Sequence, residues 1–375
     1  MRRVAATLVL LVVALAALGL VMLASSSSVL SENLFSNFFQ RQLVWMFLAA
    51  LVCIGSARLD YRWLRFWAPY VMGAVAILLV LTRVPGIGRE VNGSWRWIGI
   101  GPVNIQSSEL AKFALVLYLA SALYRMESEP AWGMRQSLWR VGLPSAMILG
   151  LVFIGPDFGT TMLLAAVAGA IMFIAGIRLR YLLMWGVAGG VGLTLAMLQD
   201  EVRMTRIKAF LDPVKHAEKE AYQLLNALYA FVAGGARGAG LGGSLQKHFF
   251  LPECHTDFIL PIIGEELGIT ASLGVWLMFV CFSVCGVIIA WKASDNFGRL
   301  LALGITLVLS VQAAINIAVV TGCMPTKGLA LPFISYGGSS LIVSGLMIGV
   351  LISVARIASS HETPRARARD RIRSM

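Results

Sequence analysis

The chain has 375 residues and a formal net charge of +12; 58% of its residues are hydrophobic and only 13% are charged. Ordinary soluble domains carry about 25% charged residues, so this composition excludes a typical water-soluble enzyme, a disordered chain and a disulfide-linked scaffold. It indicates that the lipid bilayer is the solvent of this protein. The unit to count is therefore the membrane-spanning helix.

Apolar runs recur along nearly the whole chain. A helix needs roughly 20 apolar residues to cross about 30 Å of hydrocarbon. The runs do not alternate in the way of an outer-membrane barrel, so the predicted fold class is all-α, a polytopic membrane protein with about ten spanning helices. The ten predicted spans are residues 4–24, 43–57, 66–82, 107–124, 141–155, 158–176, 179–198, 262–291, 299–321 and 338–357.

The basic residues of the loops predict the orientation. With a cytoplasmic N-terminus, eighteen Lys and Arg fall in the inner segments and five in the short outer loops. Short cytoplasmic loops are enriched in basic residues, so both termini are expected inside. We expect residues 1–357 to form the transmembrane domain and residues 358–375 a basic cytoplasmic tail that contacts anionic lipid headgroups or a cytoplasmic partner. Nucleic-acid binding is not expected, because no basic face is interleaved with aromatic residues.

A large outer loop, residues 199–261, separates the seventh and eighth spans. Apolar residues at helical spacing between Ala221 and Val232 predict an amphipathic helix at the membrane surface. The glycine-rich segment 234–243 fits either a hinge or a weak phosphate contact. The basic residues Arg203, Arg206 and Lys208 fit an anion site or, equally, a solvated interfacial stripe.

The end of this loop carries the first candidate for chemistry. Asp257 lies between a polar loop and an apolar helix, where a carboxylate can act as a general base. Capping of the next helix by Thr256 or Asp257 is the alternative, and the spacing alone favours capping. Cys254 beside His255 does not define a catalytic pair, because neighbouring residues in sequence need not meet in space.

Further ionisable residues occur inside or beside the spans. Glu109 and Lys112 are three residues apart in the fourth span and so share one helical face. Ionisable groups in a membrane pair with one another or face a cavity, so both a functional pair and a purely structural ion pair remain open. Asp157 and Lys327 lie beside backbone broken by Gly and Pro, and broken helices that face a cavity form polar sites in membrane proteins.

Five ordered motifs resemble the SEDS family (shape, elongation, division and sporulation) between residues 20 and 356. The segments GREVNG and PTKG resemble the division branch more than the elongation branch. The motifs are RQLVW from Arg41, GREVNGSWRWIGIGPVNIQSSELAK from Gly88, GPDFGTT from Gly155, LPECHTDFILPIIGEELG from Leu251 and MPTKGLALPFISYGGSS from Met324.

This resemblance implies a peptidoglycan glycosyltransferase that joins lipid II into β-1,4 glycan strands at the outer face of the bacterial cytoplasmic membrane, at the division septum. The family's essential acid matches Asp257, which reverses the preference for capping, and its other conserved acids and lysine match Glu109, Lys112 and Asp157. The implied partners are a class B penicillin-binding protein, which is a transpeptidase, and other membrane proteins of the division machinery. Two departures are Ser107, where the family usually has Pro, and Cys254.

The implied reaction inverts the configuration of the donor sugar, since an α-linked donor gives a β-linked product. Asp257 is expected to take the proton of the attacking hydroxyl, while Arg206, Lys247 or a divalent cation (Mg²⁺ or Mn²⁺) offsets the charge of the leaving diphosphate. Asp257 and His255 alone do not form a metal-ligand set. The expected supporting residues are Glu109, Lys112, Asp157, Arg206, Lys247, His255 and Lys327.

Three alternatives remain at this stage: a lipid II flippase, an elongation-type polymerase and a non-catalytic scaffold that docks a transpeptidase. A flippase would also use buried charges and broken helices, but it needs no base at the outer face. A scaffold would tolerate Asp257→Asn.

Overall fold

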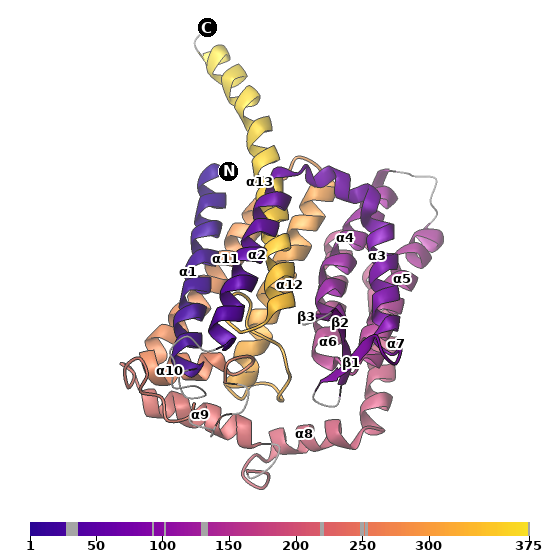
Figure 1. The fold of residues 1–375 in the computed structure, drawn as a ribbon. Coiled ribbons are helices and arrows are strands. Elements are labelled where there is room, and N and C mark those ends of the chain that lie inside the picture. Colours follow the sequence, from indigo (N-terminus) through magenta and orange to yellow (C-terminus); the bar gives the residue numbers. More distant parts are fainter. Residues whose placement is uncertain are drawn as a thin grey trace.

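The computed structural model describes residues 1–27, 37–91, 94–100, 103–128, 134–217, 221–247, 251 and 254–373. Within these ranges the chain forms a bundle of long helices with one small sheet (Figure 1). The helices are α1 (Arg2–Ser27), α2 (Asn37–Arg58), the 3₁₀ helix η1 (Tyr61–Trp63), α3 (Leu64–Leu81), α4 (Ser107–Ser128), α5 (Met134–Ile154), α6 (Phe158–Ile174), α7 (Leu179–Leu198), α8 (Glu201–Leu211), α9 (Tyr222–Gly234), α10 (Ile259–Leu267), α11 (Ile269–Trp291), α12 (Asn296–Val320) and α13 (Gly338–Arg373).

Nine of the ten predicted spans each coincide with a single helix, which confirms the all-α polytopic class. The six helices α1, α2, α3, α11, α12 and α13 are long and apolar enough to cross a membrane, and α5, α6 and α7 contain shorter apolar stretches. One prediction was wrong in detail. The run 262–291 is not one helix, because the chain breaks at Gly268 into the short α10 and the long α11.

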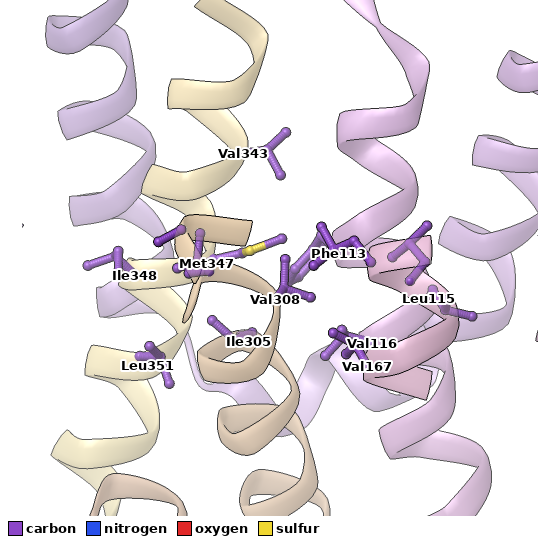
Figure 2. Packing of buried hydrophobic residues seen from close by; sticks show 14 of the residues in the cluster. Phe113, Leu115, Val116, Val167, Ile305, Val308, Val343, Met347, Ile348 and Leu351 are labelled. Carbon is purple, nitrogen blue, oxygen red and sulfur yellow. The ribbon is translucent and has the colours of Figure 1, made fainter. Parts of the chain in front are cut away.

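The centre of the bundle is built around α4, which is buried over most of its length. Figure 2 shows Phe113 and Val116 of this helix on the side toward Val308 of α12, with Val167 of α6 next to Val116, within a single core that continues into α13. Because other helices surround α4, it can carry ionisable residues that never meet lipid.

The two ends of the bundle differ. The N-terminus and the end of α13 lie at one end, as expected from an even number of spans, while α8 and α9 lie at the other (Figure 1). Helix α9 confirms the predicted amphipathic helix, and it buries Leu224, Ala227 and Ala230. Helix α13 continues without a break across residue 358 into the predicted tail.

A three-stranded antiparallel sheet was missed by the sequence analysis. Strands β1 (Gly88–Val91), β2 (Ser94–Ile100) and β3 (Val103–Gln106) pair in the order β1-β2-β3. The register sets Trp97 opposite Gln106. Strand β3 runs directly into α4 at Ser107, so the sheet fixes where the fourth span begins.

Helices α2 and α13 pack unusually closely. A Cβ at Gly349 would stand 2.3 Å from the backbone oxygen of Cys53, and one at Gly345 would stand 2.6 Å from that of Ala49. Small residues four apart allow such an approach between helices in a membrane. This contact fixes α2 against the start of α13, and both elements border the cavity described below.

The glycine-rich segment after α9 folds back onto α10. The amide of Ala239 donates to the backbone oxygen of Glu265 and that of Gly240 to the oxygen of Glu266, each at 2.9 Å. These two amides are therefore already hydrogen-bonded, and the segment connects α9 to the junction of α10 and α11.

Candidate active site

A cavity of about 880 Å³ lies at the end of the bundle away from the N-terminus of α1. Its wall combines α2, the sheet, the start of α4, the segment before α10 and the segment between α12 and α13. The residues that line it are Gln40, Arg41, Val44, Trp45, Leu48, Arg96, Trp97, Asn104, Gln106, Glu109, Thr160, His255, Thr256, Asp257, Gly328, Leu329, Ala330, Tyr336, Gly337, Gly338, Ser339 and Ser340.

Asp257 is held in this wall by its backbone and its neighbours. The backbone oxygen of His255 accepts a hydrogen bond from the amide of Tyr336 at 2.9 Å, and that of Thr256 accepts one from the Ser335 hydroxyl at 2.6 Å. The backbone oxygen of Asp257 accepts one from the side-chain amide of Asn316 at 2.8 Å. Phe258, which follows, is buried and is the N-cap residue of α10. The N-cap is thus neither Thr256 nor Asp257, and the segment presents Asp257 to the cavity.

His255 belongs to an aromatic cluster at the edge of the cavity. Its ring lies 5.1 Å from that of Phe38 and 6.1 Å from that of Tyr336, and the rings of Phe38 and Tyr336 meet edge to face at 5.4 Å. Such packing holds rings in defined orientations. The cluster joins the start of α2 to the two segments that flank Asp257.

Glu109 and Lys112 form a buried ion pair. The Lys112 ammonium donates to Glu109 Oε1 and to Gln312 Oε1 of α12, each at 2.7 Å. Lys112 is only 1% exposed, whereas Glu109 also reaches the cavity wall. The functional and the structural interpretation of this pair are therefore compatible, because it is a structural ion pair that borders the cavity.

Asp157 caps α6 and joins it to α4. Its carboxylate accepts hydrogen bonds from the amide of Thr160 at 3.1 Å and from the hydroxyl of Ser108 at 2.7 Å. Gln106, which lines the cavity, also donates to it at 3.4 Å. The side chain itself is buried and does not line the cavity. Asp157 therefore shapes the wall from behind.

Lys327 lies behind the same wall, next to Gly328. Its ammonium stands 4.9 Å from the centre of the Phe158 ring and 2.8 Å from Met162 Sδ. Burial lowers the pKa of this amine from its ordinary value, because desolvation disfavours the charged form.

The two basic residues proposed for the diphosphate lie elsewhere. Arg206 is exposed on α8 and does not line the cavity. Lys247 is buried outside it, where its ammonium pairs with Glu266 at 2.9 Å and also donates to Gly242 O and Ser25 Oγ. This pair ties the large loop to α1 and α10.

Two arginines that the sequence analysis counted only toward topology line the cavity instead. Arg41 lies near the start of α2 and Arg96 on β2. The Nε of Arg96 and the Nε1 of Trp97 are buried donors without a hydrogen-bond partner among the residues that the structure describes. Arg41 stands in the motif RQLVW, and Arg96 stands in the GSWRW part of the motif that begins at Gly88. A signal for both arginines was therefore present in the sequence.

The cavity does not fit a resident divalent cation. No three His, Cys, Asp or Glu side chains come together as a ligand group in the described part of the chain. The positive charge at the wall is supplied by the guanidinium groups of Arg41 and Arg96.

Comparison with known proteins now decides the family. A family model described as "Cell cycle protein", which covers FtsW, RodA and SpoVE, matches residues 6–360. The chain belongs to this family. The earlier resemblance is thereby confirmed over nearly the whole sequence.

Curated relatives carry one name. "Probable peptidoglycan glycosyltransferase FtsW" of Trichlorobacter lovleyi is 40% identical over 356 residues, covering 93% of this chain and 92% of that protein. The protein of the same name from Coxiella burnetii is 38% identical over 360 residues, covering 93% and 95%. The family and the class of enzyme expected from the sequence are those of these relatives.

Solved structures share the fold. One, described as "Structural coordination of polymerization and crosslinking by a peptidoglycan synthase complex", superposes with a TM-score of 0.78 at 29% identity, covering 94% of this chain and 97% of that one. The rod-shape-determining protein RodA of Thermus thermophilus gives 0.67 at 27% identity, covering 93% and 95%.

Proposed function

We propose that this protein polymerises lipid II into β-1,4 glycan strands at the outer face of the cytoplasmic membrane during cell division, with Asp257 as the general base. The observation that carries the proposal is the composition of the cavity. Asp257, Arg41 and Arg96 form a charged side, and Val44 and Leu48, which follow Arg41 along α2, form an apolar side. A substrate that joins a sugar to a lipid through a diphosphate needs such a division.

The apolar side is open to the exterior of the bundle. Val44 and Leu48 line the cavity and are nevertheless 58% and 37% exposed, so this face of α2 borders both the cavity and the surroundings. In a bilayer those surroundings are lipid. A polyprenyl tail can therefore stay in lipid while its diphosphate and sugars enter the cavity.

The charged side suits the diphosphate. Arg41 and Arg96 replace Arg206 and Lys247 as the residues proposed to bind it, since the latter two lie outside the cavity. Guanidinium groups bind phosphate through paired donors, and the buried Nε of Arg96 is a donor available for this purpose. Positive charge placed where negative charge develops is a large contribution to catalysis.

The reaction follows from this arrangement. The 4-hydroxyl of the acceptor sugar attacks C1 of the donor on the face opposite the diphosphate, and its proton passes to the Asp257 carboxylate. A new C1–O bond forms as the bond between C1 and the diphosphate oxygen breaks. The polyprenyl diphosphate leaves with the electron pair, and its charge is offset by Arg41 and Arg96.

The test is polymerisation of lipid II by the purified full-length protein in lipid nanodiscs, followed by separation of the glycan chains. We expect Asp257→Asn to abolish the chains. Arg41→Gln and Arg96→Gln should each lower the rate by tenfold or more. Arg206→Gln is the matched control, because it removes the same charge outside the cavity and should leave the rate unchanged.

The other outcomes separate the alternatives. Chains formed undiminished by Asp257→Asn would remove this residue from the mechanism, whereas a wild-type protein that forms no chains and translocates no lipid II would favour the scaffold. Translocation of lipid II headgroups by the wild-type protein, retained in Asp257→Asn and without glycan product in either, would favour the flippase.

Three finer assignments complete the proposal. Curated relatives named FtsW are 36–40% identical to this chain, compared with 27% for RodA, which supports a septal rather than an elongation role. A neighbouring structure couples polymerization with crosslinking, which supports partnership with a class B penicillin-binding protein. Both termini are assigned to the cytoplasm, because the basic residues favour the end of the bundle that holds them.

A further inference from the structure

Two buried amide side chains on α12, Gln312 and Asn316, connect the ion pair of α4 to the backbone of Asp257. They lie one helical turn apart and are each 2% exposed. Neither carries a charge or belongs to a motif noted in the sequence. We call them the amide pair.

Asn316 clamps two backbone segments together. Its Nδ2 donates to the backbone oxygen of Asp257 at 2.8 Å and to the backbone oxygen of Leu329 at 2.7 Å. An amide nitrogen has two hydrogens, so both are used. Because both partners are carbonyls, they fix which way the amide faces. Oδ1 is left buried without a hydrogen-bond partner in the described ranges. That arrangement costs free energy, and we attribute its retention to the clamp.

Gln312 continues the connection toward α4. Its Nε2 donates to the oxygen of Ala330 at 2.7 Å, while its Oε1 accepts from Lys112 at 2.7 Å. A carbonyl on one side and an ammonium on the other leave one orientation for this amide as well. Lys112 in turn binds Glu109 on the cavity wall.

We propose that the amide pair are positioning residues of the polymerase: they set the place of Asp257 in the cavity, and the Glu109–Lys112 pair acts on the reaction through them. The inference rests on the proposed function, in which Asp257 is the base. Its physical basis is that residues 328–330 line the cavity beside Asp257, and the amide pair binds both this segment and Asp257 itself. A displacement of about 1 Å at a reacting group can lower a rate by about a hundredfold.

The primary variant is Asn316→Leu, which keeps the volume of the side chain and removes both donors. We expect kcat per folded molecule to fall tenfold or more while KM for lipid II stays within twofold. A purely structural role would instead lower the yield or the melting temperature and leave kcat of the folded fraction unchanged.

The second variant, Gln312→Met, also keeps the volume, and it breaks the connection one step further from Asp257. It should show the same split with a smaller loss of kcat, and it provides the test if Asn316→Leu yields no folded protein. The matched control is Thr306→Val. It removes a buried hydroxyl on the same helix whose hydrogen bond goes to Ala302 O of α12, and it should leave kcat unchanged.

Asp257→Asn, measured in parallel, separates the two claims. If it is inactive while Asn316→Leu and Gln312→Met keep wild-type kcat, the inference about the amide pair fails and the proposed function stands. If it keeps activity, the assignment of Asp257 as the general base fails, whatever the amide variants do. The positioning role would also be overturned if Thr306→Val lost as much kcat as Asn316→Leu. The same holds if the amide variants raised KM and left kcat unchanged.

Discussion

Gly328 lies directly against the carboxylate of Asp257. A Cβ built at Gly328 would stand 3.0 Å from Asp257 Oδ2, closer than carbon and oxygen normally approach. The two residues are distant in sequence and come from different loops, yet both line the cavity. The segment between α12 and α13 therefore limits where this carboxylate can stand.

Gly328→Ala should consequently impair catalysis more than folding. The added methyl group pushes the Asp257 carboxylate away from its position, and general-base catalysis depends on hydrogen-bond reach to the attacking hydroxyl. We expect kcat for lipid II polymerisation to fall tenfold or more, with the melting temperature within a few degrees of the wild type.

Gly337→Ala is the control for that change. Gly337 lines the same cavity, but a Cβ there would meet Ser340 Cβ at 3.6 Å, an ordinary van der Waals contact. It should keep near wild-type kcat. Equal values of kcat for the two alanine variants would show that the space beside the Asp257 carboxylate does not affect catalysis.

The hydrogen bond from Ser108 to Asp157 predicts a stability effect. Ser108→Ala removes a donor from a carboxylate that is only 3% exposed, and the loss of one partner of a buried charged group costs roughly 1.5–3 kcal/mol. Unfolding should show this loss. The control is Ser121→Ala, whose buried hydroxyl donates to the uncharged oxygen of Arg65 and should cost about 1 kcal/mol. Equal losses would show that the bond from Ser108 to Asp157 contributes no more than a bond to a backbone carbonyl.

The ion pair of Lys247 and Glu266 predicts a non-additive pair of mutations. Lys247→Met leaves a fully buried carboxylate without its cation and should destabilise the protein by roughly 3–5 kcal/mol. The double variant Lys247→Met/Glu266→Gln should recover most of that stability and also polymerise lipid II with an unchanged KM. A double variant that is stable but has a raised KM would return Lys247 to the list of diphosphate ligands.

The sequence predicted what local patterns encode. Apolar runs marked the spanning helices. Asp257 was a candidate because it lies between a polar loop and an apolar helix, and the family resemblance assigned it the role of base. The residues that were missed lack a local signal: Gln312 and Asn316 are neutral side chains in an apolar helix, and their importance arises only when α12 packs against a distant loop.

Other features depend on partners that only the fold reveals. Lys247 was assigned to the substrate because Glu266, 19 residues later, was not known to reach it. The sheet was missed because its strands are only four, seven and four residues long. Arg41 and Arg96 were counted as loop charges because the cavity between α2 and β2 exists only in three dimensions.

Lys327 predicts a pH dependence of stability. Burial lowers its pKa from the ordinary value of 10.5, so in the alkaline range below that value the unfolded chain binds more protons at this site than the folded chain. Stability from this group therefore rises with pH across that range.

Lys327→Met removes the group and keeps contact with the Phe158 ring through its thioether. We expect the melting temperature of the wild type, relative to Lys327→Met, to increase between about pH 7 and pH 10. Lys208→Met, which removes an exposed lysine on α8, should show a constant offset over the same range. A wild type that instead loses stability relative to Lys327→Met as the pH rises would mean that the folded protein favours the charged amine, and that an anion rather than an aromatic ring is its principal neighbour.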